Sequence, residues 1–444
     1  MTTRADLIII GGGPGGYEIA AAEAARGQQV VLIEKDRLGG TCLNRGCIPT
    51  KCLCASADAA MTVASAAAFG VNVDGVSYDY GRAAERMRGI VDALRDDVTA
   101  LTSGCEIVHA EAAVNADGTV SADGRVFSAD KVIIATGSKA ARLPVPGAEL
   151  AMTSDEILTM DTLPASLCVI GGGVIGLEFA SIMSAFGVDV TVIEYCKEIL
   201  PPFDRDIAKR LRTLLSRRGI KFVTGAAVTA IARNDDGALT VTYKGKKGDT
   251  DMTAAAVLMA VGRRPVVPAG LAESGIETDR RGFIVTNDSM ATTRKGFYAV
   301  GDCNGRLMLA HAAAAQARLV MGHPVDLRYI PSAVFTVPEA AMVGLTAEQC
   351  DETGIAYASA KAMFAGNGKA RAMGHGDGIV KILYTPDTHT ILGCHIVGPH
   401  AADLITEAVT AMHAGLTADD IDHTLVHGHP TLSEVVAAAA ANVR

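Results

Sequence analysis

The stretch "LIIIGGGPGGYEIAAAEAARGQQVVLIEK" (residues 7–35) decides the fold. Four apolar residues run into the spacing Gly-x-Gly-x-x-Gly, which Gly11, Gly13 and Gly16 form. An alanine-rich segment of helical character follows, and a second apolar stretch then ends at Glu34. A strand, a glycine turn, a helix and a second strand in this order are typical of a βαβ unit that binds a dinucleotide.

The same pattern returns as "LCVIGGGVIGLEFASIMSAFGVDVTVIEY" (residues 167–195). Thirteen of the 29 aligned positions are identical, at an offset of 160 residues. The second copy has its glycines at Gly171, Gly173 and Gly176 and its acid at Glu194, and in both copies the acid follows the first glycine by 23 residues. One such glycine motif would be weak evidence, but two in full context predict two dinucleotide sites in an α/β fold.

Each position of the repeated motif has a physical role. The first glycine permits the tight turn, the second lets the backbone approach a pyrophosphate, and the third lets the helix pack on the strand. The helix N-terminus presents free N–H groups and the positive end of its dipole to the phosphates. The acid accepts hydrogen bonds from a ribose diol. Because a carboxylate at Glu194 would repel a 2′-phosphate, the second site is predicted to prefer NAD over NADP.

Two more apolar strands end in glycine, at 131–138 ("KVIIATGS") and 296–303 ("GFYAVGDC"). Both are expected to lie in a buried parallel sheet. Asp302 would then lie at the carboxyl end of a strand, where open α/β sheets hold ligands.

After about residue 325 the pattern changes. Residues 378–398 alternate as a hairpin around Pro386 and Asp387. Residues 401–415 read as an amphipathic helix that ends in glycine. A separate antiparallel α+β domain is therefore expected at the C-terminus.

The composition restricts the function classes. The chain has 444 residues, of which 49% are hydrophobic and 20% are charged, as in globular proteins. No uninterrupted apolar run approaches 18 residues, so no contact with a membrane is expected, and the N-terminus lacks the features of a signal peptide. A net charge of −9 without a basic block argues against nucleic acid as a partner. The 10 cysteines are too irregular for a secreted disulfide framework, which favours a reducing, cytoplasmic location.

The stretch "GGTCLNRGCIPTK" (residues 39–51) places Cys42 and Cys47 directly after the second strand of the first βαβ unit. A zinc site is disfavoured, because no second cysteine pair or histidine pair with metal-ligand spacing is evident, and no metal is predicted. Inert thiols would leave the position next to a ligand site unexplained. A pair that cycles between dithiol and disulfide explains that position.

The redox interpretation makes a geometric demand on the helix that carries the pair. Five residues of helix rise about 7.5 Å, whereas disulfides rarely span Cα separations beyond about 7 Å. The helix must therefore be distorted if the cysteines bond, and Gly46 and Pro49 can relax it. Cys47 and Cys52 have the same spacing, so the residues alone leave two pairings open.

The stretch "HGHPTLSE" (residues 427–434) offers a proton acceptor. Thiols attack disulfides only as thiolates, and a histidine suits their deprotonation because its pKa lies near neutrality. Glu434 could orient His429, as a carboxylate does in a catalytic triad. Glu434 could equally reach back to the N–H of Thr431 in a helix capping box, and both interpretations stay open on the residues alone.

The motifs together resemble those of the pyridine nucleotide–disulfide oxidoreductases over essentially the whole chain. They are "GGGPGG", "GGTCLNRGCIPTK", "ATGS", "GGGVIGLEFAS", "VGRRP", "GFYAVGDC", "MLAHAA", "FTVPEAAMVG" and "HGHPTLSE". The last motif, with Glu194, is most similar to the dihydrolipoyl dehydrogenase branch. The resemblance implies an α/β fold with two Rossmann-like domains, for FAD and NAD, and a C-terminal α+β dimerisation domain. The boundaries expected are 1–147 and 266–325 for the FAD-binding and central part, 148–265 for the NAD-binding domain and 326–444 for the dimerisation domain.

The resemblance also implies roles for single residues. Cys42 and Cys47 form the redox disulfide, with Cys42 as the interchange thiol that meets the substrate and Cys47 as the charge-transfer thiol against the flavin. Lys51 resembles the lysine near the reactive flavin nitrogen, and Glu178 resembles its partner. A positive charge there would stabilise reduced flavin and lower the pKa of the neighbouring thiol.

The C-terminal histidine is expected to act across a subunit boundary. The resemblance favours His429 as the base and Glu434 as its orienting partner, in the active site of the neighbouring subunit, so an obligate homodimer with shared sites is predicted. The role of His427 stays open. Cys52 and Cys54 lie outside the redox motif, and their simplest interpretation is that of small core residues on a helix.

The cofactor-binding residues follow from the motifs and the resemblance. For FAD they are Gly11, Gly13, Gly16, Glu34, Gly40, Thr41, Lys51, Ala112, Gly137, Asp302 and Ala310. For NAD they are Gly171, Gly173, Gly176, Glu194, Val228 and Gly262.

The reaction that the resemblance implies is the oxidation of dihydrolipoamide. A dihydrolipoyl thiol loses its proton to His429 and attacks Cys42, Cys47 leaves as a thiolate, and the second lipoyl sulfur closes the lipoyl ring. Electrons then pass to FAD and, as hydride, to NAD⁺. No lipoyl-carrying segment precedes residue 7, so a lipoyl-bearing protein of a 2-oxo acid dehydrogenase or glycine cleavage complex is expected as the partner.

Three alternatives stay in view. A sister reductase for other disulfides would normally use NADPH and show basic residues after Glu194, where "IEYCKEILP" offers one lysine. Mercuric-type relatives would carry C-terminal cysteines, which "AAAAANVR" lacks. A nucleotide-binding redox sensor without turnover would not need the complete set of cysteines, histidine and glutamate.

Overall fold

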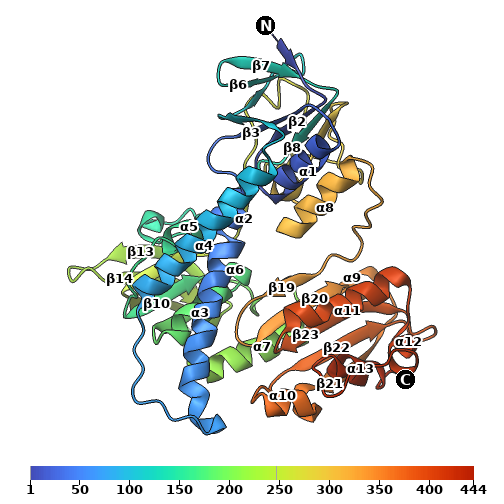
Figure 1. The fold of residues 1–444 in the computed structure, drawn as a ribbon. Helices are drawn as coiled ribbons and strands as arrows, with labels where there is room; N and C mark the ends of the chain where they lie inside the picture. The colour runs from blue at the N-terminus through green and yellow to red at the C-terminus, as the bar shows by residue number, and fades with distance from the viewer. Residues whose placement is uncertain (1, 247) are drawn as a thin grey trace. The chain divides into compact units, whose positions relative to one another are not determined.

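The computed structural model describes residues 2–246 and 248–444, and the chain divides into two compact units (Figure 1). The first comprises Met1–Cys52, Gly81–Ala141 and Gly262–Leu327. The second comprises Leu53–Tyr80, Arg142–Val261 and Arg328–Arg444. The finer domain boundaries expected from the sequence stay a prediction.

The first unit is built on a five-stranded parallel sheet with the order β18-β8-β2-β3-β4. Its strands are β2 (Leu7–Ile10), β3 (Val30–Glu34), β4 (Glu106–His109), β8 (Lys131–Ile134) and β18 (Phe297–Ala299). Along β2, Leu7 and Ile9 point into one core, and Ile8 and Ile10 into the other. Both faces of the sheet are thus buried at β2, which explains why this central strand is apolar at every position. The predicted strands at 131–138 and 296–303 are confirmed.

Helices and small sheets complete the first unit. Helices α1 (Pro14–Ala25) and α8 (Ala310–Val320) pack on each other, and α1 also packs on β3. The other elements of this part are α2 (Gly40–Arg45), α4 (Tyr80–Leu101), η3 (Gly301–Asn304), the sheet β1-β7-β6-β5 (Thr2–Arg4, Arg125–Ser128, Val120–Ala122 and Ala113–Val114), and the pair β9 (Ser138–Ala140) and β17 (Arg263–Pro265). Helix α3 (Cys47–Ser65) begins in the first unit and continues into the second, where η1 (Ala66–Phe69) follows.

The second unit contains the repeat of the βαβ pattern. A parallel sheet has the order β12-β11-β10-β16, in which β10 (Ser166–Ile170) and β11 (Asp189–Glu194) flank helix α6 (Val174–Ala185) along the chain. The other elements are α5 (Ser154–Ile157), η2 (Ala148–Leu150), α7 (Arg205–Arg217), β12 (Lys221–Thr224), β16 (Ala256–Met259), and the antiparallel meander β13 (Ala227–Arg233), β14 (Leu239–Gly245) and β15 (Gly248–Ala254). The sequence repeat is therefore a repeat of structure.

The C-terminal part of the second unit is an antiparallel sheet with the order β19-β20-β23-β22-β21 (Figure 1). The strands are β19 (Ser332–Val334), β20 (Glu339–Gly344), β21 (Ala358–Met363), β22 (Ile379–Tyr384) and β23 (Ile391–Gly398), and the helices are α9 (Ala347–Thr353), η4 (Phe364–Gly366), α10 (Gly368–Ala372), α11 (Ala401–Ala414), α12 (Ala418–His423) and α13 (Glu434–Ala440). Helices α11, α12 and α13 share one core with the sheet. The predicted hairpin and the helix that ends at Gly415 are confirmed.

A buried ion pair lies on the other face of this sheet. The ammonium of Lys381 on β22 lies 2.9 and 2.8 Å from the two carboxylate oxygens of Asp204, and 3.0 Å from Asp206. Lys381 is 4% exposed and Asp204 is fully buried. Burial alone would raise the pKa of Asp204, but the hydrogen bond from Lys381 and nearby positive charges hold it below its usual value. The hydrogen bond from Lys361 is the main reason why the pKa of Asp206 falls to about 2.

This ion pair predicts acid sensitivity. A carboxylate whose pKa is lowered by folding contributes stability that is present above its unfolded pKa, about 3.9, and that is lost as the pH falls through the folded value. The free energy of unfolding should therefore fall as the pH drops below about 4. Lys381→Met leaves Asp204 buried without its cation, which should cost about 3–5 kcal/mol at pH 7. Urea unfolding of both proteins at pH 7, 4 and 3 checks this, and equal stability at pH 7 would contradict it.

One helical stretch meets a looser criterion for a membrane-spanning helix than an uninterrupted apolar run. By length and composition, Gly40–Phe69 is long and apolar enough to cross a membrane. The search for an uninterrupted apolar run missed it because Arg45, Lys51 and Asp58 interrupt that run. A single helix of this kind is weak evidence, since helices of soluble proteins pass the same test. The expectation that the chain does not meet a membrane stays a prediction.

Candidate active site

The two cysteines of the first unit lie on either side of a break in a helix. Helix α2 ends at Arg45, Gly46 has the non-helical angles φ −144° and ψ −113°, and α3 begins at Cys47. A Cβ atom on residue 46 would lie 2.9 Å from the carbonyl oxygen of Thr41, so the break is suited to glycine. The side chains of Cys42 and Cys47 are hydrogen-bonded to each other. The helix is therefore distorted at Gly46, as a disulfide between residues five positions apart requires, and the distortion brings Cys42 and Cys47 together.

The surroundings of Cys42 set its acidity. The hydrogen bond with Cys47, followed by burial, raises the pKa of the Cys42 thiol, and the positive charge of Lys51 acts in the opposite direction. The positive charge of Lys51 thus favours the thiolate of a neighbouring cysteine. The place of Lys51 beside the flavin stays a prediction.

The first glycine motif forms a cradle with one open position. Gly11 has φ +110°, and a Cβ there would lie 2.3 Å from the carbonyl oxygen of Ala135. A Cβ on Gly16 would lie 1.9 Å from the carbonyl oxygen of Gly11. At Gly13 the nearest atom to a Cβ is the Cα of Gly40, at 3.9 Å. The first and third glycines are thus required by backbone packing, whereas the second leaves room for a phosphate at the N-terminus of α1.

The second motif has the same geometry. Gly171 has φ +107°, and its Cβ would lie 2.4 Å from the carbonyl oxygen of Ala260, while that of Gly176 would lie 2.0 Å from the carbonyl oxygen of Gly171. A Cβ on Gly173 would have no described atom within 4 Å. Both cradles therefore have room for a dinucleotide at the second glycine, and the contact of that glycine with the ligand stays a prediction.

This difference between glycines predicts two separate phenotypes. Gly173→Ala should leave stability unchanged and raise the KM for NAD⁺ about tenfold, which corresponds to about 1.4 kcal/mol, because the new methyl group occupies the phosphate position. Gly176→Ala should lower the melting temperature, because its methyl group meets the backbone. Thermal unfolding and NAD⁺ titration of both variants check this. The prediction is wrong if Gly173→Ala is the less stable of the two.

The acids at the ends of the second strands are fixed by backbone donors. Glu34 accepts hydrogen bonds from the N–H of Gly12 at 2.7 Å and of Asp36 at 2.8 Å. Glu194 accepts from the N–H of Gly172 and of Cys196, each at 2.6 Å. These donors were not predicted. Because a carboxylate has about four acceptor positions, each acid retains capacity for a ribose hydroxyl, and the ribose contact stays a prediction.

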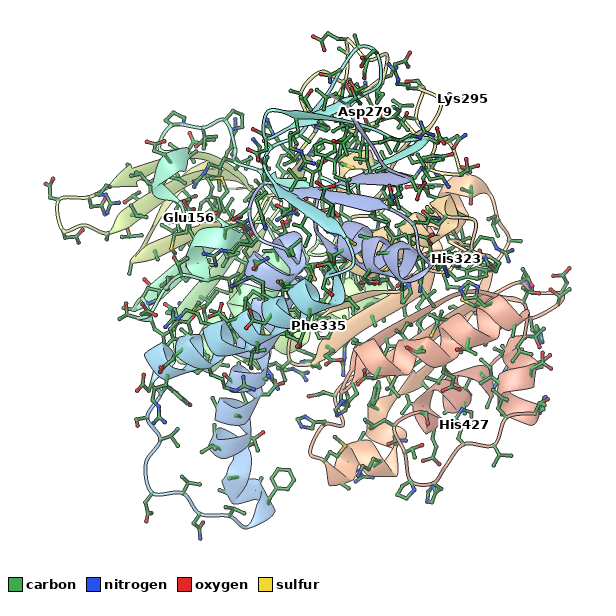
Figure 2. The ribbon with its side chains drawn as sticks, turned by 45° about the horizontal axis from the view of Figure 1, so that its top comes forward. Glu156, Asp279, Lys295, His323, Phe335 and His427 are labelled. Carbon is green, nitrogen blue, oxygen red and sulfur yellow. The ribbon has the colours of Figure 1, made fainter. Side chains whose placement is uncertain are left out.

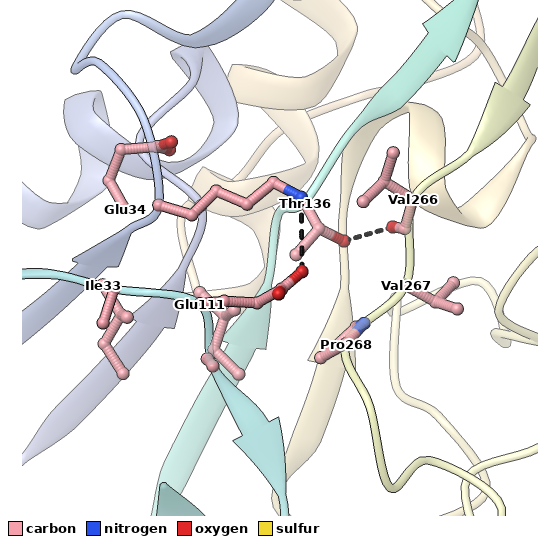
Figure 3. Close-up of a pocket in the computed structure, with 12 residues that line it drawn as sticks. Ile33, Glu34, Glu111, Thr136, Val266, Val267 and Pro268 are labelled. Atoms are coloured by element: carbon pink, nitrogen blue, oxygen red, sulfur yellow. Dashed lines mark hydrogen bonds and ion pairs between the residues drawn. The ribbon is translucent and has the colours of Figure 1, made fainter. Parts of the chain in front are cut away.

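A pocket opens at the carboxyl ends of the strands in the first unit (Figure 3). Three of the predicted FAD residues line it, namely Gly11, Glu34 and Ala112. Lys35 also lines it, and its ammonium lies 3.4 Å from the carboxylate of Glu111, a residue that Figure 3 labels. The adenosine end of a dinucleotide whose pyrophosphate lies at Gly13 would extend toward this pocket.

Asp302 is held by residues that the sequence analysis did not single out. It follows β18 in η3, as expected for a residue at the end of a strand. Its carboxylate accepts a hydrogen bond from the hydroxyl of Ser138. Arg263 donates to the same hydroxyl at 2.7 Å and lies 3.8 Å from the carboxylate. Arg263 belongs to the quoted "VGRRP" motif, which is the signal that could have identified it.

The other predicted cofactor residues lie at ends or edges of elements. Gly40 and Thr41 open helix α2, and Ala310 is the first residue of α8. Gly137 has φ +69° directly before β9, and Gly262 has φ +109° directly before β17. Val228 lies on β13, at a register shift of the meander. Their contacts with FAD and NAD stay predictions.

Glu178 is buried on α6 and has a backbone partner. It is 4% exposed, and it accepts a hydrogen bond from the N–H of Phe335 at 3.0 Å. The carbonyl group of Phe335, which Figure 2 labels, accepts in turn from the thiol of Cys54 at 3.3 Å. Lys51 lies in the first unit and Glu178 in the second, and their pairing stays a prediction.

The C-terminal histidine and glutamate form a dyad. Nδ1 of His429 lies 2.8 Å from Oε1 of Glu434, and Oε2 of Glu434 accepts from the N–H of Thr431 at 2.8 Å. The contacts from Glu434 that the two interpretations require are both present, but the capping box is wrong, because α13 begins only at Glu434 and its N-cap is Ser433. The orienting role of Glu434 stays a prediction. The hydrogen bond from His429 is the main cause that lowers the pKa of Glu434. The imidazole of His429 is 81% exposed, so a substrate can reach it.

Comparison with known proteins shows which family the chain belongs to. Residues 5–317 match the pyridine nucleotide-disulphide oxidoreductase family, and residues 330–440 match the dimerisation domain of the same family. The chain therefore belongs to the pyridine nucleotide–disulphide oxidoreductase family. The predictions of the family, of the fold class and of FAD and NAD as cofactors are confirmed, and the dimerisation domain supports a homodimer.

Within this family the chain is similar over its whole length to dihydrolipoyl dehydrogenases. It is 38% identical to that of Bacillus subtilis (strain 168), with 99% of this chain and 98% of the relative covered. It is 36% identical to that of Chlamydia pneumoniae, with 99% and 97% covered. Among solved structures it is similar to the HOCl-induced flavoprotein disulfide reductase RclA from Escherichia coli, with a TM-score of 0.87, 28% identity and coverage of 99% of this chain and 100% of the other.

Proposed function

We propose that the chain is a dihydrolipoyl dehydrogenase, which oxidises a protein-bound dihydrolipoyl group to lipoyl and passes the electrons to NAD⁺. The observation that carries the proposal is the contact of Cys42 and Cys47 across the helix break. The two dinucleotide cradles and the full-length similarity to dihydrolipoyl dehydrogenases support it.

Each step uses residues of this chain. In the oxidised state Cys42 and Cys47 form a disulfide. His429 takes a proton from a dihydrolipoyl thiol, and Glu434 holds the imidazole in orientation and stabilises its positive charge. The thiolate attacks Cys42, and Cys47 leaves as a thiolate. The second lipoyl thiol then attacks the lipoyl sulfur bound to Cys42, and its proton passes to the departing sulfur of Cys42. The lipoyl ring closes, and the chain keeps the electron pair as the Cys42 thiol and the Cys47 thiolate, with the first proton on His429.

The cradles hold the redox cofactors. Gly13 and the N-terminus of α1 would hold the pyrophosphate of FAD, and Gly173 and the N-terminus of α6 that of NAD. When bound, these cofactors would supply an acceptor for the electron pair of the dithiol and a final acceptor for hydride. Glu194 favours NAD⁺ over NADP⁺, because its buried carboxylate would face the extra phosphate.

The assembly follows from the same proposal. His429 would serve the thiol pair of the second subunit in a homodimer, which makes the active sites shared. A lipoyl-bearing protein of a multienzyme complex would deliver the substrate, and the location would be cytoplasmic. The domains would be 1–147 with 266–325, 148–265 and 326–444.

A second candidate is the reduction of another disulfide. The similarity to the disulfide reductase RclA favours it. The acid at Glu194 and the one lysine that follows it in "IEYCKEILP" count against the use of NADPH, which such reductases normally use.

Steady-state kinetics test the proposed function. The purified flavoprotein is assayed with dihydrolipoamide and NAD⁺, with lipoamide and NADH, and with glutathione disulfide and either NADH or NADPH. We expect turnover with the lipoyl substrates and the NAD pair. Turnover of glutathione disulfide with NADPH, without turnover of dihydrolipoamide, would establish the second candidate instead.

A further inference from the structure

The segment that carries His429 has one half-buried side chain among exposed ones. All residues from Asp422 to Pro430 are described, and within this stretch every residue except His427 is exposed. The side chain of Val426 is 98% exposed. A segment with so little burial is free to move unless specific contacts fix it.

His427 fixes this segment to the core of the C-terminal part. Nε2 of His427, a residue that Figure 2 labels, lies 2.6 Å from Oε1 of Glu407. The two side chains are 13% and 21% exposed. Glu407 lies on α11, which packs on β20 and β23. Burial and then the charge of Glu407 raise the pKa of the neighbouring Cys394 to about 12. The acceptor of His427 is thus a carboxylate set against the core rather than a mobile surface group.

A second contact fixes the other side of His429. The side-chain amide of Asn367 donates to the carbonyl oxygen of Thr431 at 2.9 Å. The hydroxyl of Thr431 donates to the carbonyl oxygen of Gly428 at 2.7 Å. His429 therefore lies between two fixed points, each two residues away. Glu434 contacts the imidazole ring itself and does not tie the segment to the sheet.

We propose that the His427–Glu407 pair is a positioning device for the base His429. The inference rests on the proposed function, in which His429 takes the proton from the substrate thiol. A hydrogen bond to a carboxylate in a partly buried place is stronger and better defined than one on the surface. Its loss would let the segment drift, and a displacement of about 1 Å at a reacting group can cost about a hundredfold in rate. His427 itself transfers no proton in this account.

Four variants test the pair. His427→Ala and Glu407→Leu should lower kcat for dihydrolipoamide oxidation about 10- to 100-fold. His427→Gln keeps a donor and should restore most of the rate. His389→Ala is the matched control, because His389 forms a similar dyad with Asp419 at 2.8 Å but ties the β22–β23 turn to α12. Electron transfer from NADH to ferricyanide, which bypasses the thiol chemistry, should be unchanged in all four.

The outcomes separate positioning from other roles. If His427 positions the base, kcat of His427→Ala depends on pH as in the wild-type enzyme but reaches a lower maximum. The rate of His427→Gln then exceeds that of His427→Ala. A loss of the pH dependence in His427→Ala would make His427 the base and overturn the proposal. The proposal would also be overturned if His427→Ala oxidised dihydrolipoamide as fast as His389→Ala does. A parallel loss of ferricyanide reduction in His427→Ala would overturn it as well. Failure of the wild-type protein to oxidise dihydrolipoamide would instead refute the proposed function.

Discussion

Replacement of Cys47 by serine is expected to abolish turnover of dihydrolipoamide while FAD stays bound. Serine is close in size to cysteine, so the helix break at Gly46 and the cradle at Gly13 should persist. The hydroxyl group cannot form the disulfide that accepts the electron pair. Removal of a residue that takes part in bond making costs up to about a millionfold in kcat, and we expect a loss of at least about a thousandfold here.

The measurement is the steady-state rate with dihydrolipoamide and NAD⁺, together with the flavin content from the visible spectrum. Cys105→Ser is the control, because Cys105 is a half-buried thiol between α4 and β4, whose pKa is raised by burial. The control should keep its rate. A Cys47→Ser protein with more than a tenth of the wild-type rate is not compatible with the mechanism.

Replacement of His429 by glutamine is the second large effect. General base catalysis by a positioned side chain is worth about 10²–10⁴-fold, so we expect kcat for dihydrolipoamide oxidation to fall within this range. The rise of activity with pH that reflects loss of a proton from the base should disappear. Ferricyanide reduction by NADH should be unchanged, because it needs no substrate thiolate.

The loss of kcat in Glu434→Gln can be compared with the loss in His429→Gln. The amide oxygen still accepts a hydrogen bond from the imidazole, but it does not stabilise a positive charge on the ring. We therefore expect a smaller loss than in His429→Gln. If Glu434→Gln were as inactive as His429→Gln, the carboxylate would have a role beyond orienting and stabilising the base.

Local patterns in the sequence predicted much of the fold. The strand–glycine–helix–strand pattern is set by short-range requirements, since a side chain at residue 16 or 176 would collide with the backbone five residues earlier. The break at Gly46 was likewise predictable from the rise of a helix against the reach of a disulfide. The family motifs then supplied the roles of residues that geometry alone would leave as surface charges.

Contacts between distant residues were not predictable from one sequence. Asp204 and Lys381 are 177 positions apart, and neither stands in a spacing that signals a partner. The hydrogen bond from Phe335 to Glu178 uses the backbone, so no residue type marks it. His427 was noted for its place beside His429, but its partner Glu407 lies in a helix whose pattern signals only amphipathicity.

The most direct test of the central claim is differential alkylation of the thiols. Oxidised protein, with and without one equivalent of dihydrolipoamide and without NAD⁺, is alkylated and its peptides are identified by mass spectrometry. The account predicts that Cys42 and Cys47 are linked to each other before reduction and both become alkylated after it, while the other cysteines do not change. A link between Cys47 and Cys52, or a Cys42–Cys47 pair that dihydrolipoamide does not reduce, would contradict it.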